Sequence, residues 1–227
     1  MEFIESEDAK KIALLRKVRL MALGTLQRAR SAAIPPRWLR ISRDAFKALL
    51  NPDYHKENSI NEITAIIYDN KPQLVRLPYI LIDGGDVDER TAAGCAILFR
   101  IIFYQRRGYF INCNEMVHRL QGFDKSADVS RNSLASELKQ HDALFINEFS
   151  PILFKGWMQE GEFFEEIIAD RANNLRPTII SFTKSISKIE QVTDLSCGQH
   201  IAKLSGIETL DPNPSESCLR IRVGVTA

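Results

Sequence analysis

The sequence lacks several features that mark metal-binding, secreted and membrane proteins. Its four cysteines are far apart and form no C-x-x-C pair. A zinc site and a disulfide framework are therefore not expected, and buried reduced thiols are. No apolar run approaches the roughly 18 residues of a membrane span, and the first residues are too acidic for a signal peptide. We therefore expect a cytoplasmic protein that does not enter a membrane.

The chain also lacks a strong charge of either sign. Its formal net charge is +1 over 227 residues, so contact with nucleic acid would need a local basic patch. The four histidines are scattered without metal-ligand spacing, and no metal site is expected. With 44% hydrophobic and 26% charged residues, the composition is that of an ordinary globular protein. The length predicts one large domain, or a domain with a small appendage.

One segment is strongly basic. Apolar residues recur at helical spacing over residues 5–31, which predicts a helix. We assign residues 1–31 to a basic N-terminal helix and residues 32–227 to the core. Two interpretations of the basic face stay open: a solvated helix flank, or a docking helix for a partner protein or a nucleic-acid backbone. The candidate contact residues are Lys10, Arg16, Lys17, Arg19, Arg28 and Arg30.

Beyond Pro35 and Pro36, which end this helix, strands and helices alternate. Strands are expected at 79–82, 108–112, 143–146, 178–181 and 219–225. Helices are expected at 44–50, 60–68, 115–120 (capped by Asn114), 133–140, 160–173, 184–191 and 196–204, and another follows the first strand. This alternation predicts an α/β fold, with a parallel sheet of about five strands flanked by helices and with a helical N-terminal extension.

Residues 77–107 read as a strand, a turn that begins with Gly84 and Gly85, and a helix, which is the layout of a phosphate-binding P-loop. A working loop reads G-x-x-x-x-G-K-[ST], whereas residues 84–91 read G-G-D-V-D-E-R-T. Gly84 and Thr91 fit that pattern. Glu89 replaces the second glycine, and Arg90 replaces the lysine.

The turn also carries three acidic residues, Asp86, Asp88 and Glu89. Their charges would repel a polyphosphate. Arg90 can bind phosphate oxygens, but we favour a self-satisfied charge cluster that fills the site.

The third apolar strand leads into Asn147 and Glu148. Nucleotide hydrolases place an Asp-Glu pair there, with the aspartate at Mg²⁺ and the glutamate as general base. Asn147 has no charge for a metal. Glu148 is either a relic of the base or an ordinary residue that leaves the sheet.

In this order, the segments resemble AAA+ ATPases of the IstB/DnaC type, which are helicase loaders and transposition helpers. The resemblance covers roughly residues 32–225. The matching pieces are Ile34-Pro35-Pro36-Arg37 with Phe46, residues 84–91, Gly108, Leu134-x-x-Glu137-Leu138, residues 142–148, residues 167–171, Arg176-Pro177-Thr178, residues 198–204 and residues 219–222.

The resemblance implies roles for two further residues. The family's arginine finger, which acts on a neighbouring subunit's nucleotide, falls at Lys203, and its sensing arginine falls at Arg220. A lysine keeps the charge of the finger but lacks its planar fork. Arg220 then serves as a salt-bridge partner.

The P-loop lysine, the metal aspartate and the finger arginine are thus all substituted. We expect a catalytically degenerate pseudo-ATPase that needs no cofactor. It would bind a replicative helicase, a transposase or a related ATPase, as part of a homo- or hetero-oligomer. The alternative is an unorthodox ATPase that binds Mg²⁺ and ATP through Arg90 and Thr91, uses Glu148 as base and assembles on DNA.

Overall fold

The computed structural model describes residues 7–104, 106–120, 131–150, 158–183 and 218–224. They form a parallel five-stranded sheet in the order β2-β3-β4-β1-β5. The strands are β1 (Tyr79–Gly84), β2 (Gly108–Asn112), β3 (Ala143–Phe149), β4 (Thr178–Phe182) and β5 (Cys218–Val223). The predicted α/β class and the parallel sheet are confirmed.

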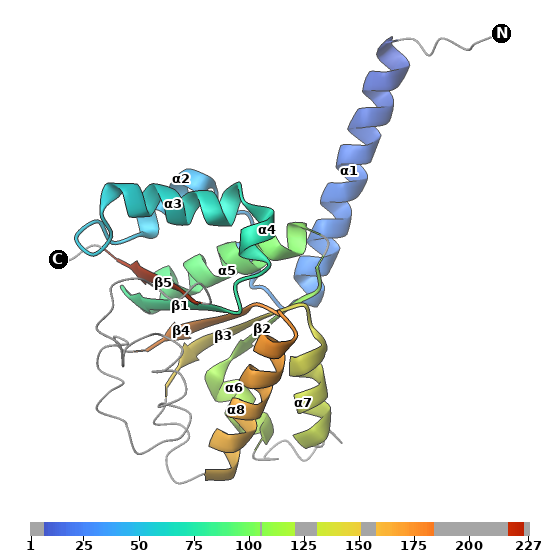
Figure 1. Cartoon of the computed structure of the whole chain (residues 1–227). Helices are drawn as coiled ribbons and strands as arrows, with labels where there is room; N and C mark the ends of the chain where they lie inside the picture. Colours follow the sequence, from blue (N-terminus) through green and yellow to red (C-terminus); the bar gives the residue numbers. More distant parts are fainter. Residues whose placement is uncertain (1–6, 105, 121–130, 151–157, 184–217, 225–227) are drawn as a thin grey trace.

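Helices cover both faces of the sheet (Figure 1). One layer consists of α2 (Arg43–Leu49), α3 (Glu57–Tyr68), α4 (Lys71–Leu74) and α5 (Val87–Phe103). The other consists of α6 (Cys113–Leu120), α7 (Arg131–Gln140) and α8 (Met158–Asn173). A 25-residue helix, α1 (Glu7–Ser31), and a short 3-10 helix, η1 (Pro36–Trp38), precede them. No helix among the described ranges is long and apolar enough to cross a membrane.

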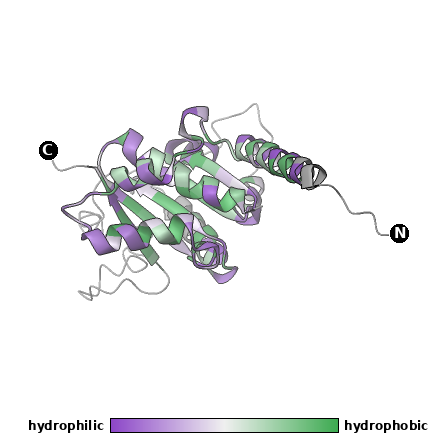
Figure 2. Ribbon diagram, turned by 90° about the horizontal axis from the view of Figure 1, so that it is seen from above, coloured by the Kyte–Doolittle hydropathy of each residue, from purple (hydrophilic) through white to green (hydrophobic). Residues whose placement is uncertain are grey.

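Alternation along the strands divides the core in two. Ile80 and Ile82 of β1 pack in the cluster under α5, whereas Leu81 packs in the cluster under α6, α7 and α8. Successive side chains of a strand point to opposite faces, so each strand supplies both clusters. The strands are coloured mainly as hydrophobic, and the helices beside them mix hydrophobic and hydrophilic residues (Figure 2).

Both edges of the sheet are covered. On β5, Leu50 forms an antiparallel bridge with Val223, and Asn51 N–H donates to Arg222 O. On β2, Phe110 N–H donates to Ala32 O, just after α1. These contacts satisfy backbone groups that would otherwise invite pairing with another chain.

Three expectations about element boundaries need correction. Asn114 does not cap a helix, because α6 begins one residue earlier, at Cys113, directly after β2. Helix α3 begins at Glu57 rather than at residue 60. The sequence did not reveal its first turn, because that turn is polar and carries no apolar periodicity. Strand β3 continues through Asn147 and Glu148, so these residues lie in the strand and not beyond it. The helices expected at 184–191 and 196–204 lie outside the described residues.

Candidate functional site: a filled P-loop

The turn between β1 and α5 has the backbone of a tight phosphate loop. Gly84 and Gly85 have φ of +80° and +52°, a region that side chains rarely adopt. A Cβ on Gly84 would lie 2.5 Å from Val223 O, so the turn is pressed against the end of β5. Glycine is therefore required there by backbone conformation and by space.

Acidic side chains occupy the N-terminus of α5. Asp86 is the N-cap residue, and its Oδ1 accepts from Glu89 N–H at 2.8 Å. Glu89 Oε2 in turn accepts from Asp86 N–H at 2.9 Å, which completes a capping box. These backbone N–H groups are the kind that bind phosphate in a working loop. Asp88 points elsewhere and pairs with Arg37 of η1 at 3.0 Å.

Arg90 folds over the turn and is only 7% exposed. Its Nε and Nη2 donate to the two carboxylate oxygens of Glu148, at 2.9 and 3.0 Å. Its Nη1 donates to Gly84 O at 2.9 Å and to Gly85 O at 2.7 Å. The guanidinium thus makes a bidentate ion pair with Glu148 and also satisfies the two loop carbonyls. Its partner is Glu148, and not the neighbouring acidic residues of the turn.

Glu148 is held from two sides. Its backbone has a positive φ of 57°, and its N–H donates to Ser181 Oγ at 2.8 Å. Its side chain is 19% exposed and is bound to Arg90. Both oxygens of its carboxylate therefore accept from the guanidinium of Arg90.

A neutral hydrogen-bond network lies beneath this ion pair. Asn147 Oδ1 accepts from Ser181 Oγ at 2.8 Å and lies 3.2 Å from Thr91 Oγ1. Asn147 Nδ2 donates to Asn112 Oδ1 at 3.0 Å. Thr91 Oγ1 also donates to Val87 O at 2.7 Å, the shorter of its two contacts. These amide and hydroxyl groups satisfy one another and supply no negative charge for Mg²⁺.

A second buried charge cluster adjoins the turn. Asp83, which is fully buried, accepts from Arg222 Nε and Nη2 at 3.0 and 2.8 Å. Arg220 Nη2 lies 3.4 Å from the same carboxylate. The hydrogen bonds to Asp83 raise the pKa of Arg222, which also stacks 4.3 Å from the Tyr54 ring. Arg220, the predicted sensing residue, is thus an ion-pair partner of β1.

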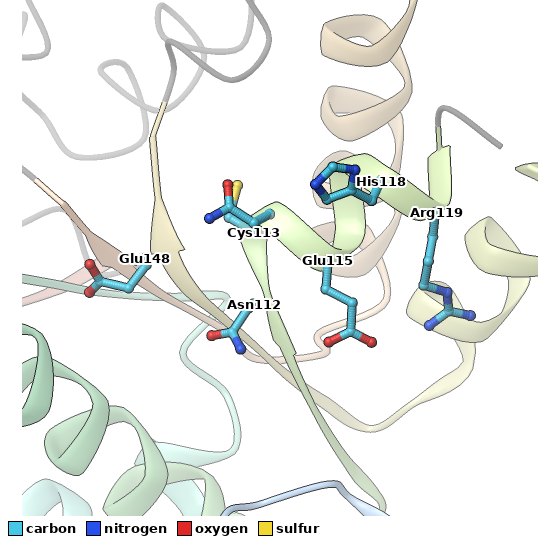
Figure 3. A pocket seen from close by; sticks show the side chains of 7 residues that line it. Asn112, Cys113, Glu115, His118, Arg119 and Glu148 are labelled. Atoms are coloured by element: carbon cyan, nitrogen blue, oxygen red, sulfur yellow. The ribbon is translucent and has the colours of Figure 1, made fainter. Parts of the chain in front are cut away.

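A pocket of about 590 Å³ lies on the other side of Glu148. Glu148 enters it from β3, and the remaining wall comes from the end of β2 and from α6 (Figure 3). Burial raises the pKa of the Cys113 thiol in this wall to about 12, so the thiol is a poor nucleophile. The lining residues are Asn112, Cys113, Asn114, Glu115, His118, Arg119 and Glu148.

The predicted site residues fall into two groups. Gly84, Gly85, Arg90, Thr91, Asn147 and Glu148 all meet at the turn. The basic residues of α1 lie at the opposite end of the sheet (Figures 1 and 2). Arg16, Lys17, Arg19 and Arg30 are exposed, and Arg28 is half-buried with Nη2 on Thr25 Oγ1. Nothing is described of the Lys10 side chain, and Lys203 lies outside the described residues.

The sequence analysis missed four residues of the networks at this site: Asp83, Arg222, Ser181 and Asn112. Asp83 and Arg222 carried a readable signal, because a charge at the end of an apolar strand needs an opposite charge nearby. Ser181 and Asn112 lie at the ends of expected strands, but their common partner Asn147 is fixed only by the strand order.

Comparison with solved structures gives the fold. Replication initiator DnaA bound to AMPPCP and single-stranded DNA matches with a TM-score of 0.52 and 14% identity, covering 78% of this chain and 51% of that one. AMPPCP-bound DnaA from Aquifex aeolicus matches with a TM-score of 0.56 and 10% identity, covering 83% and 51%. The chain thus spans about half the length of the DnaA chains it matches. The predicted α/β fold, a parallel sheet flanked by helices, is thus shared with these DnaA chains.

Three further comparisons do not extend this result. The DnaC helicase loader aligns over 84% of this chain and 100% of its own, at 17% identity, but with a TM-score of 0.49. No protein-family profile matches the sequence, and no curated protein matches it.

Proposed function

We propose that this chain is a binding protein on an AAA+ scaffold, and that it acts without hydrolysing a nucleotide. The observation that carries the proposal is the bidentate pair between Arg90 and Glu148. It joins the residue at the P-loop lysine position to the residue at the catalytic base position. Each group therefore neutralises the other, and neither is available to a nucleotide.

The groups around this pair support the same proposal. Nucleotide binding would need free N–H groups at the helix N-terminus and a carboxylate for the metal, and hydrolysis would also need a free base. In this chain, Asp86 and Glu89 occupy the N–H groups. Asn147 is neutral and committed to Ser181. Binding a polyphosphate would therefore require the capping box and the partly buried hydrogen bonds of Arg90 to be broken.

For the partner, we propose a replicative helicase, a transposase or a related ATPase of DNA replication or of mobile elements. The ordered resemblance to helicase loaders and transposition helpers supports this choice. The fold of the DnaA replication initiator supports it as well, and one such structure holds single-stranded DNA. DNA is accordingly a second proposed partner, and homo- or hetero-oligomers are the proposed assemblies.

Thermal unfolding with excess Mg·ATP or Mg·ADP tests the proposal. A ligand at about 100 times its Kd adds about 2.7 kcal/mol to the free energy of unfolding. We expect no shift of Tm for the natural chain at millimolar nucleotide. The variant Glu89→Gly/Arg90→Lys/Asn147→Asp restores the full P-loop pattern and the metal carboxylate, and it should gain a shift.

Two controls make the result decisive. Arg43→Ala removes an exposed arginine that pairs with Asp69, away from the turn, and should behave as the natural chain does. Arg90→Ala should lower Tm without creating a dependence on nucleotide. A shift in the natural chain that Arg90→Ala abolishes would contradict the proposal. It would favour the ATPase alternative, in which Arg90 holds phosphate.

A further inference from the structure

Most of α1 projects from the body of the molecule (Figure 1). The large apolar side chains described in this part lie in solvent. The last turns of α1 are anchored, since Thr25, Ala29 and Ala32 are buried. Six large side chains before them are 44–69% exposed: Leu14, Leu15, Val18, Leu20, Met21 and Leu23. Isolated exposed leucines are ordinary, but six within ten residues form a patch that water disfavours.

The exposed residues are spread around the helix. At about 100° per residue, Leu14, Val18 and Met21 continue the line of the anchored face. Leu20 and Leu23 point to the other side of the helix. Green and purple alternate along the projecting part, without one hydrophobic and one hydrophilic side (Figure 2). An occupant must therefore enclose the helix on more than one side.

Beyond Glu7 and Asp8 in its first turn, the charge of α1 has one sign. Between residues 9 and 30 the chain carries seven basic residues and no acidic one. Pairing with α1 of a second copy would bring like charges together, which is unfavourable. Membrane-surface helices separate an apolar face from a polar one, and α1 does not. A nucleic-acid backbone would bind the arginines but would leave the leucines in water.

We propose that the projecting part of α1, Glu7–Leu23, inserts into an apolar groove rimmed by carboxylates on a partner protein. The groove buries the leucine, valine and methionine side chains, and its acidic rim pairs with Arg16, Lys17 and Arg19. This inference deepens the proposed function, because it rests on the chain being a binding protein and gives the chemistry of the surface it binds.

Ca²⁺-loaded calmodulin is a suitable probe, because it is an acidic protein that encloses basic, apolar helices in open grooves. Calorimetric titration of the full chain should give a complex in the micromolar range or tighter that weakens as salt is raised. Calcium-free calmodulin keeps its acidic surface but closes the grooves, and should not bind. Leu14→Gln/Val18→Gln/Met21→Gln should weaken the complex by about tenfold or more. Leu175→Gln, at an equally exposed leucine away from α1, should leave the affinity unchanged.

Several outcomes would overturn this inference. One is equal affinity with and without Ca²⁺, or no effect of the triple glutamine variant. Another is a dimer of the natural chain that the triple variant dissociates, since the occupant would then be a second copy. A third is tight binding to phosphatidylglycerol vesicles without binding to calmodulin. Because no nucleotide takes part, failure here is distinguishable from failure of the proposed function.

Discussion

Arg171 is the largest side chain that the described core encloses completely. Its Nε donates to Thr178 Oγ1, and its Nη atoms donate to the carbonyls of Leu138, His141 and Pro177, at 2.6–2.9 Å. All four acceptors are uncharged, and burial lowers the pKa of Arg171 to about 9. One guanidinium thus ties the end of α7, the end of α8 and the start of β4 together.

Replacing Arg171 by methionine should therefore be severe. Three carbonyls, of which those of Leu138 and Pro177 are buried, would lose a charged donor. We expect a loss of about 3 kcal/mol or more in the free energy of unfolding. Arg171→Lys should recover only part of the lost stability. An ammonium lacks the planar fork with which the guanidinium reaches several acceptors in different directions. Urea unfolding measures both. The exposed Arg43→Met should cost less than about 1 kcal/mol, and equal losses at both positions would contradict the argument.

We expect His55 to make the free energy of unfolding depend on pH. It is buried, its Nε2 accepts from Arg222 N–H at 2.9 Å, and it faces Asp83, Arg220 and Arg222. Burial is the largest cause of a pKa below the ordinary 6.5, while Asp83 acts in the opposite direction. Below about pH 6.5 the unfolded chain therefore binds more protons than the folded one. The free energy of unfolding should decrease as the pH is lowered.

Urea unfolding at pH 7.5 and pH 5.5 tests this dependence. The natural chain should be less stable at the lower pH. His55→Gln should lose part of that difference, since the titrating group is gone. His118→Gln, at an exposed position of α6, should retain it. A dependence that is identical in all three chains would show that His55 does not contribute.

At the candidate site, the sequence predicts which residues are substituted but not which side chains pair. The substitutions at Glu89, Arg90 and Asn147 are visible in the sequence alone. The pairing of Arg90 with Glu148 is not, because 58 positions separate them and only the packing of α5 on β3 brings them together. The Ile-Ile-Ala-Asp-Arg and Arg-Pro-Thr segments were noted only as a resemblance. Arg171 and Thr178 now give that resemblance a physical reason.

At the scale of elements, we expect a glycine-to-alanine substitution to have opposite effects in two helices. A Cβ on Gly94 of α5 would lie 2.1 Å from the Phe145 ring, so the helix packs directly on β3. A Cβ on Gly24 of α1 would meet only Arg28 Nη1, at an ordinary 3.5 Å. Gly94→Ala should therefore destabilise the chain by about 1–3 kcal/mol through overpacking.

Gly24→Ala should instead stabilise α1, by about 0.5–1 kcal/mol, because alanine is the better helix former. Circular dichroism should record more helix and no loss of Tm. For Gly94→Ala the Tm should drop. Equal behaviour of the two variants would contradict the packing of α5 described above.

Element prediction succeeded where hydrophobic pattern decides structure. The five strands are apolar runs, and a parallel sheet buried on both faces needs such runs. Helix α4 was missed, because it spans only Lys71–Leu74 and includes Pro72. The first turn of α3 was missed because Asn58 and Ser59 carry no hydrophobic period.

At the scale of the whole molecule, the projecting part of α1 should contribute little to stability. The large apolar side chains described in it, from Leu14 to Leu23, are exposed, so removing residues 1–23 forfeits little of the burial that the structure describes. We expect a change below about 1 kcal/mol in the free energy of unfolding by urea, with a gain in solubility. Ala32→Leu, in the anchored turn, should cost about 1–3 kcal/mol. A truncated chain that fails to fold would contradict this division.

The same arrangement separates the two ends of the molecule. At 1.5 Å per residue, the stretch Glu7–Leu23 is about 25 Å long, and it leaves the sheet at the end opposite the turn of Gly84. A protein seated on that rod stands clear of the carboxyl ends of the strands. If α1 binds a partner as proposed, the filled loop at Gly84 therefore stays uncovered at the far end of the sheet.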